Sequence, residues 1–276
     1  MKKEIADKIL EKVKADYEAT ASEFSDSRGY LWEELKQFEK YVKGNMNILD
    51  LGCGNGRLYE IFKDKKINYT GIDNCAPLIK LAQVKWISSL ELKTLNQEPK
   101  NQSSKFKVQS SKSTFIVGDA LDLKFEDNKF DIVFSVAVLH QIPSIELRLK
   151  VLQNISRVLK KGGNLVMTNW NLWQPKYFPF VLKNNIKKLI GLSKFDFNDS
   201  LIPWHQSGIN RYYHAFTKFE LTSLLSRTNF KVVEQYYVKK GQKANGLNGY
   251  NLVTVANKKH WNITQNMLNL KSNHSL

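Results

Sequence analysis

The residues from Asn47 to Asp73 carry the first group of side chains whose types and spacing indicate a binding site. Gly52, Gly54 and Gly56 stand at alternate positions directly after an apolar run. Glycines in such a turn allow the backbone to approach a ligand where a Cβ atom would clash. Asp73 ends a second apolar run, and its carboxylate can accept hydrogen bonds from both hydroxyls of a ribose. The spacing therefore indicates a nucleotide-type ligand between a glycine turn and an acid.

The elements that position these residues follow from the apolar pattern. The run 48–51 is typical of a buried strand, and the spacing of Leu58, Ile61 and Phe62 predicts a helix after the glycines. Residues 67–72 predict a second strand that ends at Asp73. Strand, glycine turn, helix, strand and acid make up the first half of a nucleotide-binding α/β fold.

Three ligands compete for such a turn. A dinucleotide fold would show G-x-G-x-x-G, whereas here G-x-G-x-G is followed by Arg57 and Leu58. A phosphate-binding loop of the type G-x-x-x-x-G-K-[ST] is absent. The third ligand is S-adenosylmethionine (SAM), whose methionine part packs on the glycine turn and which brings no pyrophosphate. A structural turn without a ligand is the remaining alternative.

The order of the motifs favours SAM. DLGCGNG (50–56) followed by GID (71–73) resembles the first two motifs of the class I SAM-dependent methyltransferases. Further segments resemble later parts of that family, in the family's order: FIVGDA (115–120), FDIVFSVAVLHQI (130–142), VLKKGGNLVMTNW (158–170), KVVEQYYV (231–238) and YNLVTVAN (250–257). Lys161 departs from the family, which usually has Pro before the Gly pair, but a Pro there only stiffens a turn.

The resemblance implies a fold and a set of cofactor residues. The expected fold is α/β, a Rossmann-like seven-stranded sheet that is mostly parallel and closes with an antiparallel C-terminal hairpin. Asp73 is expected to hold the ribose of SAM and Asp119 its adenine. The complete set of residues expected to bind the cofactor is Asp50, Gly52, Gly54, Gly56, Asp73, Asn74, Asp119 and Ala120.

Composition restricts the partners. The 276 residues carry a net charge of +16, and no Asp or Glu occurs from Gln235 to Leu276, where six lysines fall. A basic surface of this kind suits a polyanion such as RNA, although solubility alone is the alternative. No apolar run is long enough to span a membrane, the charged N-terminal residues do not form a secretory signal, and Cys53 and Cys75 are too few for a disulfide framework or a Cys-based zinc site. We therefore expect a cytoplasmic protein without a membrane anchor or a metal.

The domain organisation follows from the same pattern. Residues 1–44 are expected to form a helical N-terminal lid, with an amphipathic helix at residues 3–20 and a second helix at about residues 31–42. Residues 45–258 are expected to form the methyltransferase domain. Within that domain, the Ser- and Lys-rich stretch 84–113 is predicted to be a flexible insertion, and residues 174–214, after the fifth strand, a substrate cap. Residues 259–276 are expected to form a polar, basic tail.

A second group of chemically active residues lies in the cap. IPWHQSGINRYYHAF (202–216) places two histidines, an arginine and several aromatic rings within a short stretch, and His140 follows the fourth strand. A planar guanidinium can bind a carboxylate in a bidentate manner. Aromatic rings such as Trp170, Trp204 and Tyr212 can stack an extruded base. No histidine pair has the i, i+4 spacing of a helical metal site, so no metal is expected.

These cap residues narrow the resemblance. An S-R-x-x-x-W element at 27–32 and above all P-W-H…R-Y-Y-H-x-F at 203–216 resemble the tRNA wobble-uridine methyltransferases that esterify 5-carboxymethyluridine, including the methyltransferase domain of the AlkB-type tRNA proteins. The resemblance implies the anticodon region of a tRNA as substrate, and a small activator protein as a possible partner. The residues expected to serve catalysis are Arg28, His140, His205, Arg211, Tyr212 and His214.

Two other functions stay open on the sequence alone. The same fold hosts many small-molecule O-, N- and C-methyltransferases, in which an arginine could equally hold a free acid. A non-catalytic RNA-binding protein with an inactive methyltransferase core is the third possibility, although the intact glycines and acids argue against it.

Overall fold

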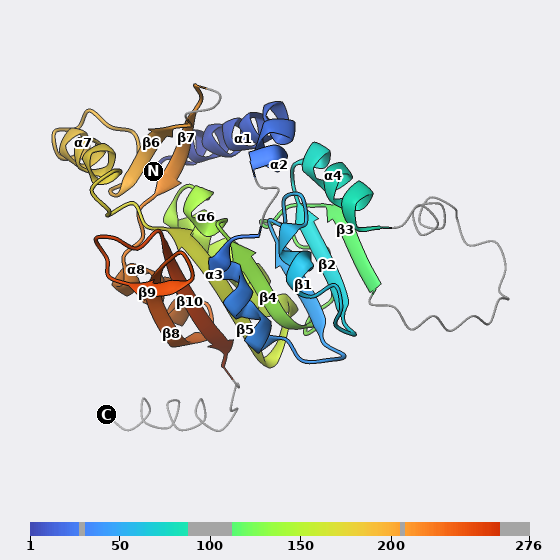
Figure 1. Ribbon diagram of the computed structural model, residues 1–276. Coiled ribbons are helices and arrows are strands. Elements are labelled where there is room, and N and C mark those ends of the chain that lie inside the picture. Colours follow the sequence, from blue (N-terminus) through green and yellow to red (C-terminus); the bar gives the residue numbers. More distant parts are fainter. Residues whose placement is uncertain (28–30, 88–111, 205–207, 260–276) are drawn as a thin grey trace, which may run out of the picture.

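An eight-stranded sheet forms the centre of the molecule (Figure 1), and its strand order is β3-β2-β1-β4-β5-β10-β8-β9. The computed structural model describes residues 1–27, 31–87, 112–204 and 208–259. The first five strands of this order are parallel: β3 (Lys112–Val117), β2 (Asn68–Asp73), β1 (Asn47–Leu51), β4 (Phe130–Val136) and β5 (Leu159–Trp170).

The C-terminal strands run antiparallel, as expected. β10 (Asn251–Lys258) pairs antiparallel with both β5 and β8 (Phe230–Lys239). The predicted hairpin is therefore confirmed, but the predicted count of seven strands is one too low. The connection between β8 and β10 contains a further short strand, β9 (Gln242–Ala244), which pairs with the outer edge of β8. A three-residue strand with no apolar alternation leaves little signal in the sequence.

Both faces of the sheet are covered by helices, because its strands present apolar side chains on alternate faces. In β1, Ile48 packs on one face, while Leu49 and Leu51 pack on the other. The first face is covered by α3 (Glu33–Lys36), the 3₁₀ helices η1 (Gln37–Tyr41) and η2 (Arg57–Ile61), and α4 (Ala76–Trp86). The second is covered by α6 (Ile145–Val158) and α8 (Lys218–Arg227).

The topology determines where a ligand can bind. The chain passes from β1 outward to β2 and β3 and then crosses back to β4 on the other side of β1. In open α/β sheets ligands bind at the carboxyl ends of the strands that flank such a switch point. The glycine turn follows β1, and the 3₁₀ helix η3 (Leu139–Gln141), which contains His140, follows β4.

The predicted lid and cap lie together at this end of the sheet (Figure 1). The lid begins with α1 (Lys3–Ala19), where the sequence predicted a helix, and continues with α2 (Ala21–Ser27), which it did not predict. The cap consists of α7 (Phe178–Leu189) and a separate two-stranded sheet of β6 (Asp199–Pro203) and β7 (Asn210–His214). α1 contacts β7, so the two segments meet although they are far apart in the sequence.

Two predicted segments lie mostly outside the described residues. Of the predicted insertion 84–113, only 84–87 and 112–113 are described, and of the predicted tail only Lys259. The second lid helix, predicted near residues 31–42, is present as two short pieces, α3 and η1. No helix of the described residues is long and apolar enough to cross a membrane.

Candidate active site

A cavity of about 320 Å³ lies at the carboxyl ends of β1, β2 and β4, and the glycine turn forms part of its wall. Gly52 and Gly54 have φ angles of 72° and 55°, which side chains with a Cβ rarely adopt. A Cβ on Gly52 would lie 2.3 Å from Val138 Cγ2, whereas a Cβ on Gly54 would meet only Phe24, at 3.5 Å. Gly52 is therefore required by the packing of the protein itself, and Gly54 leaves space that a ligand can use.

Asp73 is fixed at the end of β2 by backbone donors. Its two carboxylate oxygens accept hydrogen bonds from Gly54 N and Cys75 N, each at 2.9 Å. Burial raises the pKa of Asp73, and the two N–H groups oppose that shift. Each oxygen keeps a further lone pair, so the carboxylate can still accept the hydroxyls of a ribose.

Asp50 lies at the same end of β1, beneath the glycine turn. It accepts a hydrogen bond of 2.5 Å from the hydroxyl of Tyr69, and its Oδ1 has no hydrogen-bond partner among the described residues. Burial raises the pKa of Asp50 to about 7; the Tyr69 hydroxyl opposes that shift, and the nearby charge of Asp73 adds to it. Asp50 thus faces the cavity as a carboxyl with unused hydrogen-bonding capacity.

Three further predicted cofactor residues line the same cavity. Asn74 follows Asp73, while Asp119 and Ala120 follow β3. Asp119 is exposed, and its Oδ1 accepts a hydrogen bond of 2.8 Å from Leu121 N, which closes a tight turn. The structure therefore brings seven of the eight predicted cofactor residues to this cavity, from the ends of β1, β2 and β3. The eighth, Gly56, does not line it, and a Cβ there would meet Phe115 and Trp86.

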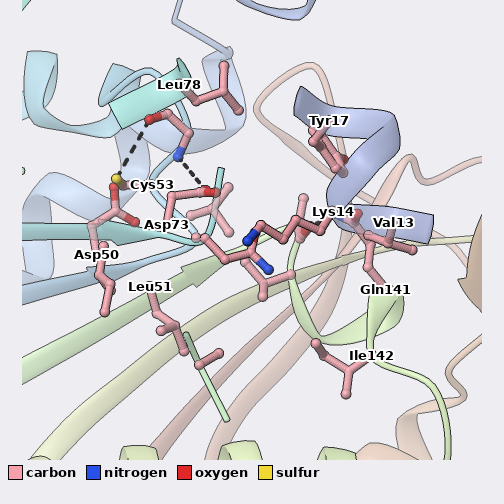
Figure 2. Close-up of a pocket in the computed structure, with 18 of the residues that line it drawn as sticks. Val13, Lys14, Tyr17, Asp50, Leu51, Cys53, Asp73, Leu78, Gln141 and Ile142 are labelled. Atoms are coloured by element: carbon pink, nitrogen blue, oxygen red, sulfur yellow. Dashed lines mark hydrogen bonds between the residues drawn. The ribbon is translucent and has the colours of Figure 1, made fainter. Parts of the chain in front are cut away.

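The lid helix covers this cavity. Val13, Lys14 and Tyr17 of α1 lie across the cavity from Asp50 and Asp73 (Figure 2). The sequence analysis did not name them as site residues. Their spacing on one helix face was the signal that could have found them.

A stack of aromatic rings forms the wall toward the cap. Trp170, at the end of β5, stacks on Tyr213, His140 and Trp204, with ring centres 5.0, 5.8 and 6.5 Å away. His140 is fully buried, and burial lowers its pKa to about 3, so the ring is neutral. Its Nδ1 lies 3.4 Å from Asn169 Oδ1. Trp170, Tyr213 and His140 also line the cavity.

Arg211 is held next to this stack on β7. Its guanidinium carbon lies 4.4 Å from the centre of the Tyr17 ring and 4.1 Å from that of Trp204. Nη2 donates to Thr20 Oγ1 at 2.8 Å, while Nε and Nη1 have no hydrogen-bond partner among the described residues. The side chain is only 2% exposed. A buried guanidinium with unused donors is costly to maintain unless an anionic group binds there.

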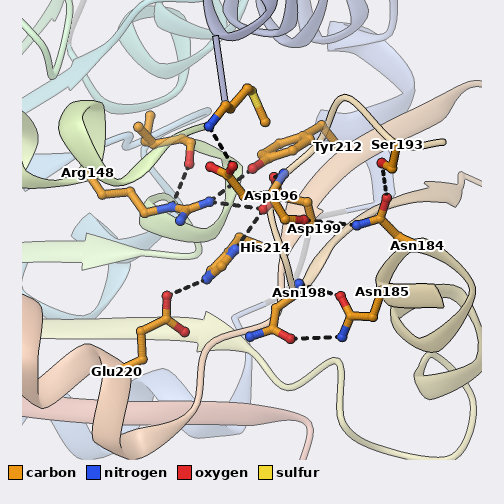
Figure 3. A network of polar contacts seen from close by, with 12 residues as sticks. Arg148, Asn184, Asn185, Ser193, Asp196, Asn198, Asp199, Tyr212, His214 and Glu220 are labelled. Atoms are coloured by element: carbon orange, nitrogen blue, oxygen red, sulfur yellow. Dashed lines mark hydrogen bonds and ion pairs between the residues drawn. The ribbon is translucent and has the colours of Figure 1, made fainter. Parts of the chain in front are cut away.

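Tyr212 and His214 point to the opposite face of β7, because side chains alternate along a strand. Figure 3 shows them in a polar network around the fully buried Asp199. The His214 ring lies 2.7 Å from Asp199 Oδ1 and, on its other side, 2.7 Å from Glu220 Oε1. Arg148 Nη2 donates to Asp199 at 3.2 Å and to the Tyr212 hydroxyl at 3.0 Å.

This network corrects the grouping of the predicted catalytic residues. The structure brings Arg211 and His140 to the aromatic wall, and of these two only His140 lines the cavity. Tyr212 and His214 neither join the wall nor line the cavity. Their contacts indicate that they hold β6, β7 and α6 together. The tyrosine that stacks on Trp170 is Tyr213 and not the predicted Tyr212, and Tyr213 was not among the predicted site residues. Arg28 and His205 lie outside the described residues, so their roles stay predictions.

The cavity fits SAM and shows no metal site. An acid at the end of β2, an open space at Gly54 and Asp119 after β3 lie at one cavity, and their assignment to the ribose, methionine and adenine parts of SAM stays a prediction. When bound, SAM supplies an electrophilic methyl group. Among the described residues no three His, Cys, Asp or Glu side chains are grouped as metal ligands would be.

Comparisons with known proteins agree with this fold and cavity. Residues 49–167 match the family described as "Methyltransferase domain". A SAM-dependent methyltransferase from Methanosarcina mazei superposes with a TM-score of 0.61 at 24% identity, over 82% of this chain and 98% of that one. Residues 49–167 therefore form a methyltransferase domain, and the chain has the fold of the SAM-dependent methyltransferases.

Two curated relatives share more specific names. The "tRNA (carboxymethyluridine(34)-5-O)-methyltransferase" of Schizosaccharomyces pombe is 26% identical over 238 residues, which are 80% of this chain and 89% of that protein. The "Probable tRNA methyltransferase 9B" of Bos taurus is 27% identical over 191 residues, or 69% of this chain. The chain spans only 32% of the length of that second relative.

Proposed function

We propose that this methyltransferase acts on tRNA and esterifies the carboxylate of a 5-carboxymethyluridine-type wobble uridine. The names of the relatives in Schizosaccharomyces pombe and Bos taurus support a tRNA substrate, as does the net charge of +16. The proposal of a carboxylate substrate rests on Arg211. This buried guanidinium lies on the ring of Trp204, and its Nε and Nη1 have no hydrogen-bond partner in the part of the chain that the structure describes.

The chemistry asks little of the protein beyond alignment. A carboxylate is ionised at neutral pH, so it can attack the methyl group of SAM in line without a general base. Bound SAM would supply the methyl group and keep the electron pair of the broken carbon–sulfur bond on its sulfur, so the new C–O bond would need no base from the protein. Alignment of this kind can contribute up to about 7–11 kcal/mol. Arg211 would hold the carboxylate and the Trp170–Tyr213 wall would hold the uracil ring, without any residue that transfers a proton.

Arg211→Gln tests the anchor. We expect kcat/KM for tRNA to fall about 30-fold to several thousand-fold, equivalent to about 2–5 kcal/mol, because a buried charge pair is lost. SAM affinity, measured by calorimetry, should be unchanged. Arg227→Gln is the matched control, since Arg227 is exposed in the last turn of α8. Normal transfer by the Arg211 variant would remove this residue as the anchor.

The substrate class needs its own experiment. Labelled-methyl transfer from SAM to bulk tRNA should appear or rise after mild saponification, which exposes carboxylates, and the product should be alkali-labile. Transfer should also weaken steeply with salt, because phosphate contacts release counterions. No transfer to either tRNA sample, with SAM binding intact, would favour the small-molecule alternative or a missing activator.

The activator protein and the cytoplasmic location stay predictions. A purified activator of the predicted kind should raise transfer by the full chain if it is required. Loss of SAM binding by the chain itself would instead revive the non-catalytic RNA-binding alternative.

A further inference from the structure

A second cavity, of about 670 Å³, lies on the other side of the aromatic wall. It shares Trp170 and Trp32 with the wall of the cofactor cavity, so the two cavities are neighbours. Because Trp170 ends β5 and its register partner Asn251 begins β10, this second cavity opens beside the carboxyl end of β5. We name it the β5–β10 groove. Of the residues that the sequence marked for the site, Trp170 lines this groove, and none of the predicted catalytic or cofactor-binding residues does.

The walls of the β5–β10 groove suit a nucleobase. They include Trp32, Trp170, Tyr177 and Tyr250, whose rings offer flat apolar surfaces. Tyr250 is 40% exposed, so a base can reach it from solvent. Every nucleobase has a π-face, and stacking on such rings is the usual way in which proteins hold unpaired nucleotides.

Its polar groups fit the other parts of a nucleotide. Lys176 lines the groove, and its Nζ lies 5.2 Å from the centre of the Tyr177 ring. Lys239 does not line the groove, but its Nζ lies 5.2 Å from the centre of the Tyr250 ring, which does. An ammonium group beside a stacking ring is placed for the phosphate of a nucleotide whose base lies on that ring. Deeper in, the Asn251 side chain is 7% exposed, and its Oδ1 has no hydrogen-bond partner among the described residues. A buried acceptor of this kind lacks an N–H donor, which a base edge can supply.

The acidic residues of the groove do not exclude such a ligand. Glu34 accepts a hydrogen bond from the backbone N–H of Lys240, and Glu33 pairs with Lys36 at 2.7 Å. With both carboxylates engaged, the lysines remain the side chains that can meet a phosphate. The groove is lined by two glutamates and two lysines, so its charges balance. This balance argues against a highly charged ligand and for a single nucleotide.

We propose that the β5–β10 groove binds the unpaired nucleotide next to the target uridine in the RNA loop. The base stacks on Tyr250 or Tyr177, and the phosphate lies against Lys176 or Lys239. This inference rests on the proposed function, because it places the target uridine on the other side of Trp170, at Arg211. Methyl transfer to the target uridine then depends on the adjacent nucleotide, because that nucleotide is bound in the groove.

Direct binding of RNA tests the groove without any methyl transfer. An unmodified, labelled anticodon stem-loop is titrated with the full chain by fluorescence anisotropy. Tyr250→Ala should raise the Kd roughly 5- to 150-fold, the loss expected for one base stacked on an aromatic ring. Lys176→Ala should reduce the slope of log K against log salt by about 1. Phe219→Ala and Lys150→Ala are matched controls on α8 and α6; Phe219 is 85% exposed and neither residue lines the groove.

A series of substrates of increasing length tests whether the groove acts on the neighbouring nucleotide or on the uridine itself. Transfer is measured on the nucleoside 5-carboxymethyluridine and on dinucleotides that carry one neighbour on the 5′ or the 3′ side. We expect one neighbour to raise kcat/KM in the wild type, and this gain to vanish in Tyr250→Ala while nucleoside transfer is unchanged. The proposal would be wrong if Tyr250→Ala lowered kcat/KM equally for the nucleoside and the dinucleotide. It would also be wrong if this variant bound the stem-loop with the Kd of the wild type.

The two proposals fail in different ways. If the wild type binds the stem-loop through Tyr250 but methylates no carboxymethyluridine, the proposed reaction is wrong and the groove stands. If transfer to carboxymethyluridine occurs and no neighbour changes kcat/KM, the reaction stands and the groove does not.

Discussion

The two faces of β7 carry the same kinds of residue in opposite states. On one face, Tyr212 and His214 belong to a network in which Arg148, Asp199 and Glu220 contact their side chains at 2.7–3.0 Å. On the other, Arg211 is equally buried, yet Nε and Nη1 have no partner among the described residues. Satisfied buried groups hold a fold together, whereas an unsatisfied buried cation marks a place for a ligand. Burial alone does not separate scaffold from site, but hydrogen-bond satisfaction does.

The largest effect on stability is expected for Asp199→Ala. This change leaves the Arg148 guanidinium and the His214 ring buried without their carboxylate, which costs about 3–5 kcal/mol. The Tm should fall by roughly 10 °C. Asp122→Ala is the control, because Asp122 forms only an exposed pair with Lys124. A Tm within one degree of the wild type would mean that the network is not structural.

Asp50→Asn extends the comparison to the cofactor cavity. Burial raises the pKa of Asp50 to about 7 from an ordinary value of 3.8, so the folded chain holds its proton more tightly than the unfolded chain. This group therefore costs stability progressively as pH rises from about 4 to 7, and the cost is constant above that. Asp50→Asn should stabilise the protein by at most about 4 kcal/mol at pH 8 and hardly at pH 4. Thermal unfolding at both pH values measures this, and an equal gain at both would contradict the raised pKa.

Arg211→Met should separate stability from activity. Removing an unsatisfied buried charge should raise the stability of the ligand-free protein by about 1–2 kcal/mol, while transfer to tRNA is lost. Denaturant unfolding and labelled-methyl transfer give the two readouts. A loss of stability comparable to that of Asp199→Ala would show that Arg211 is structural, like the residues on the other face.

The smallest effect is expected for Tyr212→Phe. The hydroxyl loses its hydrogen bonds with Arg148 and Asp199, but these two residues stay paired with each other, so the cost should be about 1 kcal/mol. Because Tyr212 does not line the cavity, kcat/KM should stay within about twofold of the wild type. A large loss of transfer at unchanged stability would restore the direct role that the sequence predicted for this residue.

The cofactor cavity was predictable from the sequence because the signals for it lie close together along the chain. Glycines at 52, 54 and 56, an acid at the end of the next strand and apolar strands in between follow from backbone conformation and periodicity. The structure brings these residues together as the order of the motifs predicted, and the fold differs mainly by the short strand β9. One feature was not local: Gly52 is required by contact with Val138, from another part of the chain.

The substrate half was only partly predictable. The sequence identified the stretch 202–216 and, within it, Arg211, but it grouped Tyr212 and His214 with that arginine. Strand alternation, which was available from the spacing, separates them and selects Tyr213 instead. The partners Tyr17 and Thr20 come from α1, and no local pattern indicates a contact between segments so distant in the chain.

The sequence by itself determined the chain order of the strands, the class of cofactor and the presence of an arginine suited to an acid. Those features depend on residue types and short spacings, which act within one element and the turn after it. Only the tertiary structure decided which side of β7 faces the cavity, that α1 covers it, and that Trp170 separates the cofactor cavity from the β5–β10 groove. These depend on how α1, β5, β7 and β10 pack against one another, and packing between distant segments is set by the whole folded chain.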